Sequence, residues 1–395
     1  MSNKITHLQP SDLRAMARLA TDATKGVTDL VEAMHATIVR PMGLASRTAK
    51  DRTTGLTGLV YKAVRGTTGL VQNSLDLALR QLKPRLTDRS SSFERDAVIS
   101  ALNGVLGDYL VATENELAIP MSFYRDGDPL TINEESLARI PNVSGRILIV
   151  IHGLCMNDRQ WLHNGHNHAE SLAAELGYTP IYLRYNSGQH VSVNGRELSE
   201  RIDTLIAAWP QPVEDITILA HSMGGLVARS ASHFASERKH AWIKTLKKIV
   251  FLGTPHHGAP LERGGHWIDI ILGATPYAKP FARLGKVRSV GITDLRYGYV
   301  TESDWTHPKR AQTTPLPAKV KCYAIAATTG KTEHDWKDRL LGDGLVPVAS
   351  ALGMHDEAEH TLKFAKTRQW VGYEMNHMQL LSDSRVYAKL LNWLR

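Results

Sequence analysis

The chain has 395 residues, of which 43% are hydrophobic and 22% charged, so its composition is that of a globular protein with a large core. Its apolar runs, such as residues 147–151, are far shorter than the roughly 18 residues that a membrane-spanning helix needs. The first twenty residues lack the continuous apolar stretch of a secretory signal, which makes the cytoplasm the expected location. The two cysteines, Cys155 and Cys322, are expected to be buried thiols.

The net charge of +8 is unevenly distributed, because residues 1–100 hold 15 Lys and Arg against 9 Asp and Glu. A solvated helical surface accounts for this excess, and peripheral contact of residues 1–85 with an anionic membrane is the alternative. Nucleic-acid binding is not expected, because the basic region lacks interleaved aromatic residues and a recognisable module.

Residues 1–115 are predicted to form a helical, basic N-terminal extension. Apolar residues recur at steps of three and four on one expected helix face: Val27, Leu30, Val31, Met34 and Ile38. A Gly-x-x-x-Leu-Val pattern then repeats at residues 26, 55 and 66. The packing partner of these helices stays open between the rest of the chain, a second subunit and a membrane surface. Residues 93–111 predict a further amphipathic helix, and residues 117–132 a β-hairpin at the edge of a sheet.

From residue 146 onward, short β-branched runs alternate with helical patterns. The expected strands are residues 146–151, 179–185, 215–220, 247–252 and 320–326, and the expected helices are 168–176, 196–209 and 223–237. Such alternation is typical of a doubly wound α/β protein with a mostly parallel sheet covered on both faces. Ligands of such sheets bind beyond the carboxyl ends of the strands.

The stretch 215–230 combines an expected strand, a sharp turn at Ser222 and an expected helix. A serine at such a turn projects its hydroxyl from the end of the sheet, and the helix behind it directs backbone N–H groups toward the same point. Small residues are required two positions before and after the serine, where Ala220 and Gly224 stand. A strand-to-helix turn with no chemical role is the alternative interpretation.

This stretch resembles the nucleophile elbow of the α/β-hydrolase superfamily, Gly-x-Ser-x-Gly, with Ala220 in place of the first glycine. The resemblance is to lipase-like and esterase-like members, in particular the branch similar to GPI inositol-deacylases. It implies a hydrolase domain over residues 116–395. Residues 258–315 form a connection much longer than is usual between two strands, and they are interpreted as a cap. The resemblance also implies that the His152-Gly153 loop supports an oxyanion hole formed by the amides of Leu154 and Met223; a plain glycine turn is the alternative there.

In this superfamily an acid and a histidine follow the serine in chain order. Asp343, in a Gly-Asp-Gly turn, is the expected acid, and Asp335 and Asp338 are weaker candidates. His377, just before a terminal helix expected over residues 382–394, is the expected base. His355 and His360 are interpreted as surface residues, because no strand separates them from the acid.

The segment 251–260 resembles the Gly-Thr-Pro-His-x-Gly segment of lipases, which implies that His256 and His257 border the substrate pocket. A purely structural turn is the alternative for these two residues. His152 and Gly153 are expected to border the same pocket. Within the cap, Trp267 and its apolar neighbours suit an acyl chain or form the core of the cap. A second histidine group, at His163, His166 and His168, lacks an ordered zinc motif. No metal and no cofactor is therefore expected.

Together these features predict a serine hydrolase that cleaves small-molecule or lipid carboxylic esters through a Ser-His-Asp triad and an acyl-enzyme. An acyltransferase, a thioesterase or an amidase on the same fold is the alternative within this class. A catalytically silent, membrane-associated scaffold is the alternative from another class. The sequence leaves the oligomeric state open.

Overall fold

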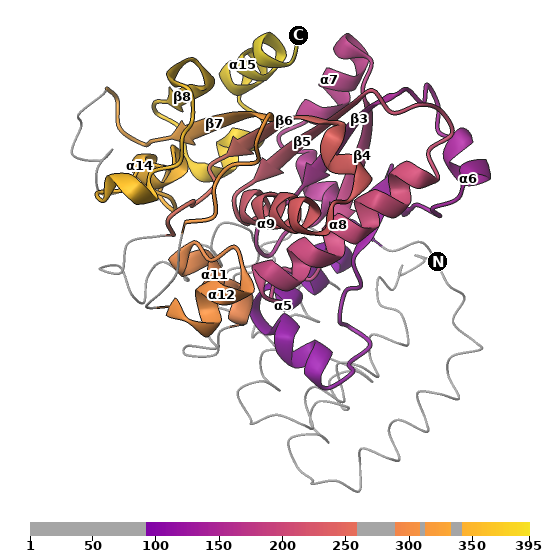
Figure 1. Cartoon of the computed structure of the whole chain (residues 1–395), viewed down its shortest axis with the longest axis horizontal. Coiled ribbons are helices and arrows are strands. Elements are labelled where there is room, and N and C mark those ends of the chain that lie inside the picture. Colours follow the sequence, from indigo (N-terminus) through magenta and orange to yellow (C-terminus); the bar gives the residue numbers. More distant parts are fainter. Residues whose placement is uncertain (1–91, 259–288, 309–312, 333–341) are drawn as a thin grey trace, which may run out of the picture.

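A computed structural model of the chain describes residues 92–258, 289–308, 313–332 and 342–395 (Figure 1). The predicted helices within residues 1–91, the weaker acid candidates Asp335 and Asp338, and Trp267 with most of the expected cap lie outside the described residues.

The described residues form one eight-stranded sheet in the order β2-β1-β4-β3-β5-β6-β7-β8. The six strands from β4 to β8 in this order run parallel, and the β1–β2 hairpin joins the β4 edge antiparallel. The strands are β1 Ser122–Arg125, β2 Asp128–Pro129, β3 Arg146–Ile151, β4 Thr179–Arg184, β5 Asp215–His221, β6 Leu246–Leu252, β7 Lys321–Ala327 and β8 Gln369–Gly372. The predicted doubly wound α/β class with an edge hairpin is thereby confirmed.

Helices cover both faces of this sheet (Figure 1). Successive side chains of a strand point to opposite faces, and β3 shows both: Ile147, Ile149 and Ile151 belong to one buried cluster, and Leu148 and Val150 to the other. The first cluster includes side chains of α5, α8 and α9, and the second those of α7 and α15. The helices are α5 Phe93–Ala112, α6 Glu134–Ala138, α7 His168–Leu176, α8 Val191–Ala207, α9 Met223–Arg238, α11 Val290–Tyr297, α12 Glu302–Thr306, α14 Val348–Ala351 and α15 Ser384–Leu394.

Helix α5 is part of the core of the sheet. Its first turn is capped by Ser92, whose side chain accepts a hydrogen bond from the amide of Arg95. Its residues Val98, Leu102 and Leu110 are fully buried in the cluster that also holds the inner residues of β3. Since residues 1–91 lie outside the described part, the division of the chain at residue 115 stays a prediction, but α5 itself packs on the sheet.

The register of the parallel strands brings three segments together at their carboxyl ends. Ile151 of β3 pairs with Ala220 of β5, and His221 of β5 pairs with Leu252 of β6. The residues that follow these ends are therefore neighbours in space. Among the described helices, none combines the length and the apolar composition needed to cross a membrane.

Candidate active site

Ser222 lies at the turn between β5 and α9, in a backbone conformation that serine rarely adopts. Its φ is 54° and its ψ is −125°, and a positive φ costs free energy for any residue with a Cβ atom. The turn is held because the amide of Ser222 donates a hydrogen bond of 2.8 Å to the carbonyl of Leu252 in β6. The side chain is almost buried and lines a small cavity.

The small residues around Ser222 are required by their surroundings, as the sequence predicts. A Cβ atom on Gly224 would lie 2.6 Å from the carbonyl oxygens of both Ile151 and His152. One on Gly225 would lie 1.9 Å from Thr254 Oγ1. Helix α9 can therefore approach the end of β3 and the segment after β6 only because these positions carry no side chain.

Asp343 and His377, which the sequence predicts as acid and base, are hydrogen-bonded to each other. His377 Nδ1 donates to Asp343 Oδ2 at 2.6 Å, and the His377 amide donates to the Asp343 carbonyl at 3.1 Å. The other carboxylate oxygen, Oδ1, accepts hydrogen bonds from the amides of Leu345 and Val346 at 2.9 and 2.8 Å. Because Nδ1 carries the shared proton, Nε2 of the neutral imidazole carries the lone pair and can act as a base.

The His152-Gly153 loop lies directly against the serine. A Cβ atom on Gly153 would lie 3.0 Å from the Cβ atom of Ser222, so glycine is needed for this approach. The amides of Leu154 and Met223, which the resemblance assigns to the oxyanion hole, are in buried residues. Within the described part of the chain neither amide donates a hydrogen bond. Both are thus available to a negatively charged oxygen.

One cavity of about 30 Å³ connects these groups. Ser222, His377, Gly153 and Leu154 all line it. The rest of its wall is mostly apolar and consists of Cys155, Met156, His221, Leu295, Leu345 and Met378. Leu295 comes from α11, in the described part of the segment expected as a cap. Burial raises the pKa of the Cys155 thiol to about 12, so this thiol stays protonated at neutral pH.

His152 supports the loop from behind. Its Nδ1 lies 2.8 Å from the Gly153 carbonyl, and its ring stacks on Tyr185 with 4.4 Å between the ring centroids. Its side chain is fully buried, and burial lowers its pKa to about 3, which keeps the ring neutral. His152 does not line the cavity of Ser222 and is thus placed as a support for Gly153.

His256 and His257 are also away from this cavity, which corrects the expectation that they border it. They line a separate cavity of about 320 Å³, together with Arg229, Tyr297 and His360. The reason is Gly253, which takes a φ of 58° after β6 and turns the chain. A Cβ atom on Gly253 would lie 3.0 Å from His377 Cε1, so in this segment Gly253, rather than the histidines, contacts the site.

His221 is a second neighbour of the base that the sequence did not single out. Its Nε2 donates to the His377 carbonyl at 3.3 Å, and the two rings lie 4.6 Å apart. Burial, and the nearby His377, lower its pKa far below the ordinary value. Its position next to Ser222 was the signal available in the sequence, but its contact with His377 joins residues 156 positions apart in the chain.

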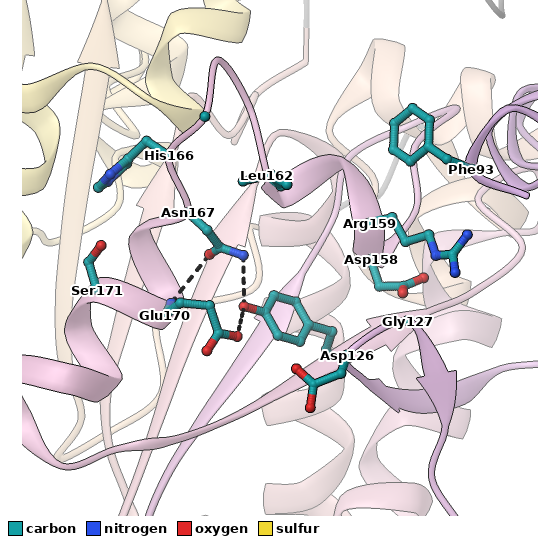
Figure 2. Close-up of a pocket in the computed structure, with 12 residues that line it drawn as sticks. Phe93, Asp126, Gly127, Asp158, Arg159, Leu162, His166, Asn167, Glu170 and Ser171 are labelled. Carbon is teal, nitrogen blue, oxygen red and sulfur yellow. Dashed lines mark hydrogen bonds between the residues drawn. The ribbon is translucent and has the colours of Figure 1, made fainter.

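A larger cavity, of about 650 Å³, lies beside α7 (Figure 2). Three of its polar residues are hydrogen-bonded to one another: Asn167 Nδ2 donates to Tyr182 Oη at 2.9 Å, and Tyr182 Oη donates to Glu170 Oε1 at 2.6 Å. Ser171 and His166 also line it, but Nε2 of His166 is hydrogen-bonded to His168 Nδ1. The cavity of Ser222 is therefore the candidate site because of its chemistry and not its size.

The predicted histidine group at His163, His166 and His168 is used in internal contacts. His163 and His166 form a β-bridge through their backbones. Both ring nitrogens of His168 are hydrogen-bonded, Nδ1 to His166 Nε2 at 2.9 Å and Nε2 to the Leu380 carbonyl at 3.1 Å. These bonds orient the loop before α7 against the residues that follow His377.

Comparison with known proteins agrees with this architecture. Residues 142–336 match the family described as "PGAP1-like alpha/beta domain". The match spans β3 to β7 with the serine turn, and it ends before Asp343 and His377. No curated protein matches the chain.

Several solved structures are similar to the chain at low identity. The Bacillus licheniformis lipase BlEst2 is 15% identical, with a TM-score of 0.44, over 70% of this chain and 98% of the other. The Aspergillus fumigatus lipase B is 11% identical, with a TM-score of 0.44, over 97% of this chain and 84% of the other. The strand order and the serine turn are those of the α/β-hydrolase fold, and the family match over residues 142–336, just under half of the chain, agrees with that fold.

Proposed function

We propose that the protein is a serine hydrolase that cleaves carboxylic esters, with Ser222 as nucleophile, His377 as base and Asp343 as acid. The observation that carries the proposal is the 2.6 Å hydrogen bond from His377 Nδ1 to Asp343 Oδ2, on a histidine that lines one cavity with Ser222. Ser222 follows β5, Asp343 lies between β7 and α14, and His377 begins the turn before α15. Their chain order is that of the superfamily.

In the proposed reaction His377 Nε2 takes the proton of the Ser222 hydroxyl as Oγ attacks the ester carbonyl. The carbonyl oxygen becomes negatively charged and accepts hydrogen bonds from the amides of Leu154 and Met223. The imidazolium then gives its proton to the departing alkoxide, and an acyl-enzyme remains on Ser222. Water repeats the sequence and releases the carboxylic acid.

The apolar wall of the cavity favours an ester with an apolar acyl group. Leu154, Met156, Leu295, Leu345 and Met378 surround the reacting atoms. Apolar walls with a few convergent polar groups are typical of small-molecule sites. Activity against a series of p-nitrophenyl esters from acetate to palmitate is expected to measure the acyl preference.

Replacement of the nucleophile is the direct test. Ser222→Ala keeps the Cβ atom and hence the backbone strain, so it removes only the hydroxyl. We expect kcat for p-nitrophenyl butyrate to fall by at least roughly a thousandfold, with loss of labelling by a fluorophosphonate probe.

Ser171→Ala is the matched control, because Ser171 lines the larger cavity beside α7. It should retain full activity and labelling. Substantial turnover by pure Ser222→Ala would exclude Ser222 as the nucleophile, and loss of activity in Ser171→Ala would move the site to the other cavity. Product analysis with added alcohol distinguishes hydrolysis from acyl transfer.

A further inference from the structure

Residues 355–360 read His-Asp-Glu-Ala-Glu-His, so five of six consecutive side chains carry a nitrogen or oxygen that can bind a metal ion. The segment follows α14 and lies far along the chain from the serine turn. His355, Glu357 and His360 line the cavity of about 320 Å³ that also contains His257. None of these residues has a role in the proposed ester hydrolysis.

The local backbone brings three of these side chains to one point. Ala358–His360 form a 3₁₀ turn with Glu357 as its N-cap residue, and residues three apart are superimposed in such a turn. His360 Nε2 lies 3.1 Å from Glu357 Oε2 and 3.8 Å from Glu359 Oε1. One ligand atom from each of the three residues lies within 4.8 Å of the others.

These separations suit a small divalent cation. Zinc bonds to histidine nitrogen and carboxylate oxygen are about 2.0–2.2 Å long, so ligand atoms around a tetrahedral Zn²⁺ are roughly 3.4 Å apart. The two distances from His360 Nε2 lie on either side of that value. A simple histidine–glutamate pair would account for Glu357 alone, whereas the second carboxylate, Glu359, faces the same nitrogen.

The other nitrogen of His360 is held as metal-binding histidines usually are. Nδ1 lies 2.8 Å from the hydroxyl of Thr313. When Nε2 binds a metal, Nδ1 carries the proton and donates it to a neighbouring oxygen, which fixes the orientation of the ring. Thr313 supplies that oxygen from a segment that is 47 residues away in the chain.

We propose that Glu357, Glu359 and His360 bind one divalent transition-metal ion, with Zn²⁺ as the best fit. One nitrogen and two carboxylates favour Zn²⁺ over Mg²⁺ and Ca²⁺, which prefer oxygen ligands alone. Water completes the coordination. His355 stands next to the ligands, its ring centroid 5.1 Å from those of both His360 and His257, so the ion would lie at the end of a row of imidazoles along the cavity wall.

The test is calorimetric titration of the untagged full-length protein, stripped with a chelator, with Zn²⁺ alone and with Mg²⁺ alone. We expect one Zn²⁺ per chain and no saturable binding of Mg²⁺ at the same concentrations. His360→Ala and Glu357→Gln are each expected to weaken Zn²⁺ binding at least about tenfold. Thr313→Val, which leaves all three ligands in place, should weaken it several-fold.

The chain offers a matched control in His233 and Glu237 on α9. They form an exposed histidine–glutamate pair with 3.3 Å between Nε2 and Oε1, and their exposure is close to that of His360 and Glu357. His233→Ala and Glu237→Gln should bind Zn²⁺ as the unaltered protein does. His166→Ala should do the same.

The proposal is overturned if His360→Ala and Glu357→Gln bind Zn²⁺ as tightly as the unaltered protein. It is also overturned if binding disappears in His166→Ala instead, or if the chain binds no Zn²⁺. Thermal unfolding of each metal-free variant shows whether it is folded, and a weaker Thr313→Val supports the site even if a ligand variant proves unstable. The outcome is independent of ester hydrolysis, because none of these residues lines the cavity of Ser222.

Discussion

Asp343 uses its two carboxylate oxygens for different partners, and this division determines which ring nitrogen of His377 faces the carboxylate. Oδ1 accepts two backbone hydrogen bonds from Leu345 and Val346, so the carboxylate cannot rotate freely. Oδ2 is left for Nδ1 of His377. The result is a fixed tautomer with the lone pair on Nε2, which the proposed reaction requires.

Asp343→Asn is therefore expected to disable the base without unfolding the protein. The two amides would select the side-chain carbonyl of the asparagine, and its NH₂ group would then face His377 Nδ1. His377 Nδ1 would then have to accept a hydrogen bond from this NH₂ group, so the proton of the imidazole would be on Nε2. We expect kcat to fall by roughly ten-thousandfold, as the loss of the correct tautomer does in serine proteases, measured with p-nitrophenyl butyrate.

Asp356→Asn, at an exposed position beyond α14, is the control and should leave kcat unchanged. A fall of less than tenfold in Asp343→Asn, with an unchanged melting temperature, would contradict the assignment of the acid.

The sequence predicted Ser222, Asp343 and His377 as a set, because each lies in a short motif with a local backbone requirement. It failed for His256 and His257, because the direction of the chain after β6 depends on the positive φ of Gly253. That angle is not encoded by any spacing of residues. Contacts such as the one from His221 to the His377 carbonyl depend on the assembled sheet and are also absent from local patterns.

At the scale of elements, α5 is the helix whose position changes the interpretation of the chain. Residues 93–111 were predicted as a helix of the N-terminal extension, but its inner face packs into the cluster beneath β3. The Ser289 hydroxyl also donates to the Gly104 carbonyl, which ties the start of α11 to α5. A truncation designed to test residues 1–91 should therefore end before Ser92.

Leu102→Ala tests whether α5 contributes to the stability of the hydrolase core. Leu102 is fully buried, and truncation of such a side chain leaves a cavity that costs about 2–5 kcal/mol. We expect the free energy of unfolding, measured in urea, to fall by about 3 kcal/mol.

Val111→Ala on the same helix is the control, because Val111 is 43% exposed and should cost less than about 1 kcal/mol. Equal effects of the two substitutions would mean that α5 does not belong to the cooperative core.

The parallel strands were predictable because continuous apolar, β-branched runs are typical of strands that are buried on both faces. The edge strand β8 and the start of α8 were harder to predict from the sequence. Strand β8 has four residues, three of them only partly buried, and no alternating pattern. Helix α8 begins at Val191, five residues before its predicted start. The start was missed because the N-cap residue His190 is not a typical capping residue and makes no side-chain capping bond. In addition, the β-branched Val191 and Val193 suggest a strand.

The molecule as a whole contains buried histidines that are neutral at pH 7. Burial lowers the pKa of His152 to about 3, and burial together with the charge of His166 lowers that of His168 to about 4. The same cause acts on His221 and His256. In the unfolded chain these groups return to the ordinary value of 6.5, so the folded state binds fewer protons below that pH.

The stabilisation that comes from these neutral histidines is therefore expected to be fully present above pH 6.5 and to decrease as the pH falls toward 4. Each fully buried group contributes a slope of up to about 1.4 kcal/mol per pH unit in this window. The free energy of unfolding in urea should be clearly lower at pH 5.5 than at pH 7. In His168→Gln the difference in unfolding free energy between the two pH values should be smaller. Equal stability of the unaltered protein at the two pH values would contradict the neutral state of these rings.

The backbone angle at Ser222 has a consequence for any effort to raise the thermal stability of this protein. Glycine would relax the turn, since it tolerates a positive φ, and we expect Ser222→Gly to raise the melting temperature. The same exchange would delete the hydroxyl that the proposed reaction requires. Directed evolution that selects variants for thermal stability alone would therefore enrich inactive variants, unless each round also selects for ester hydrolysis.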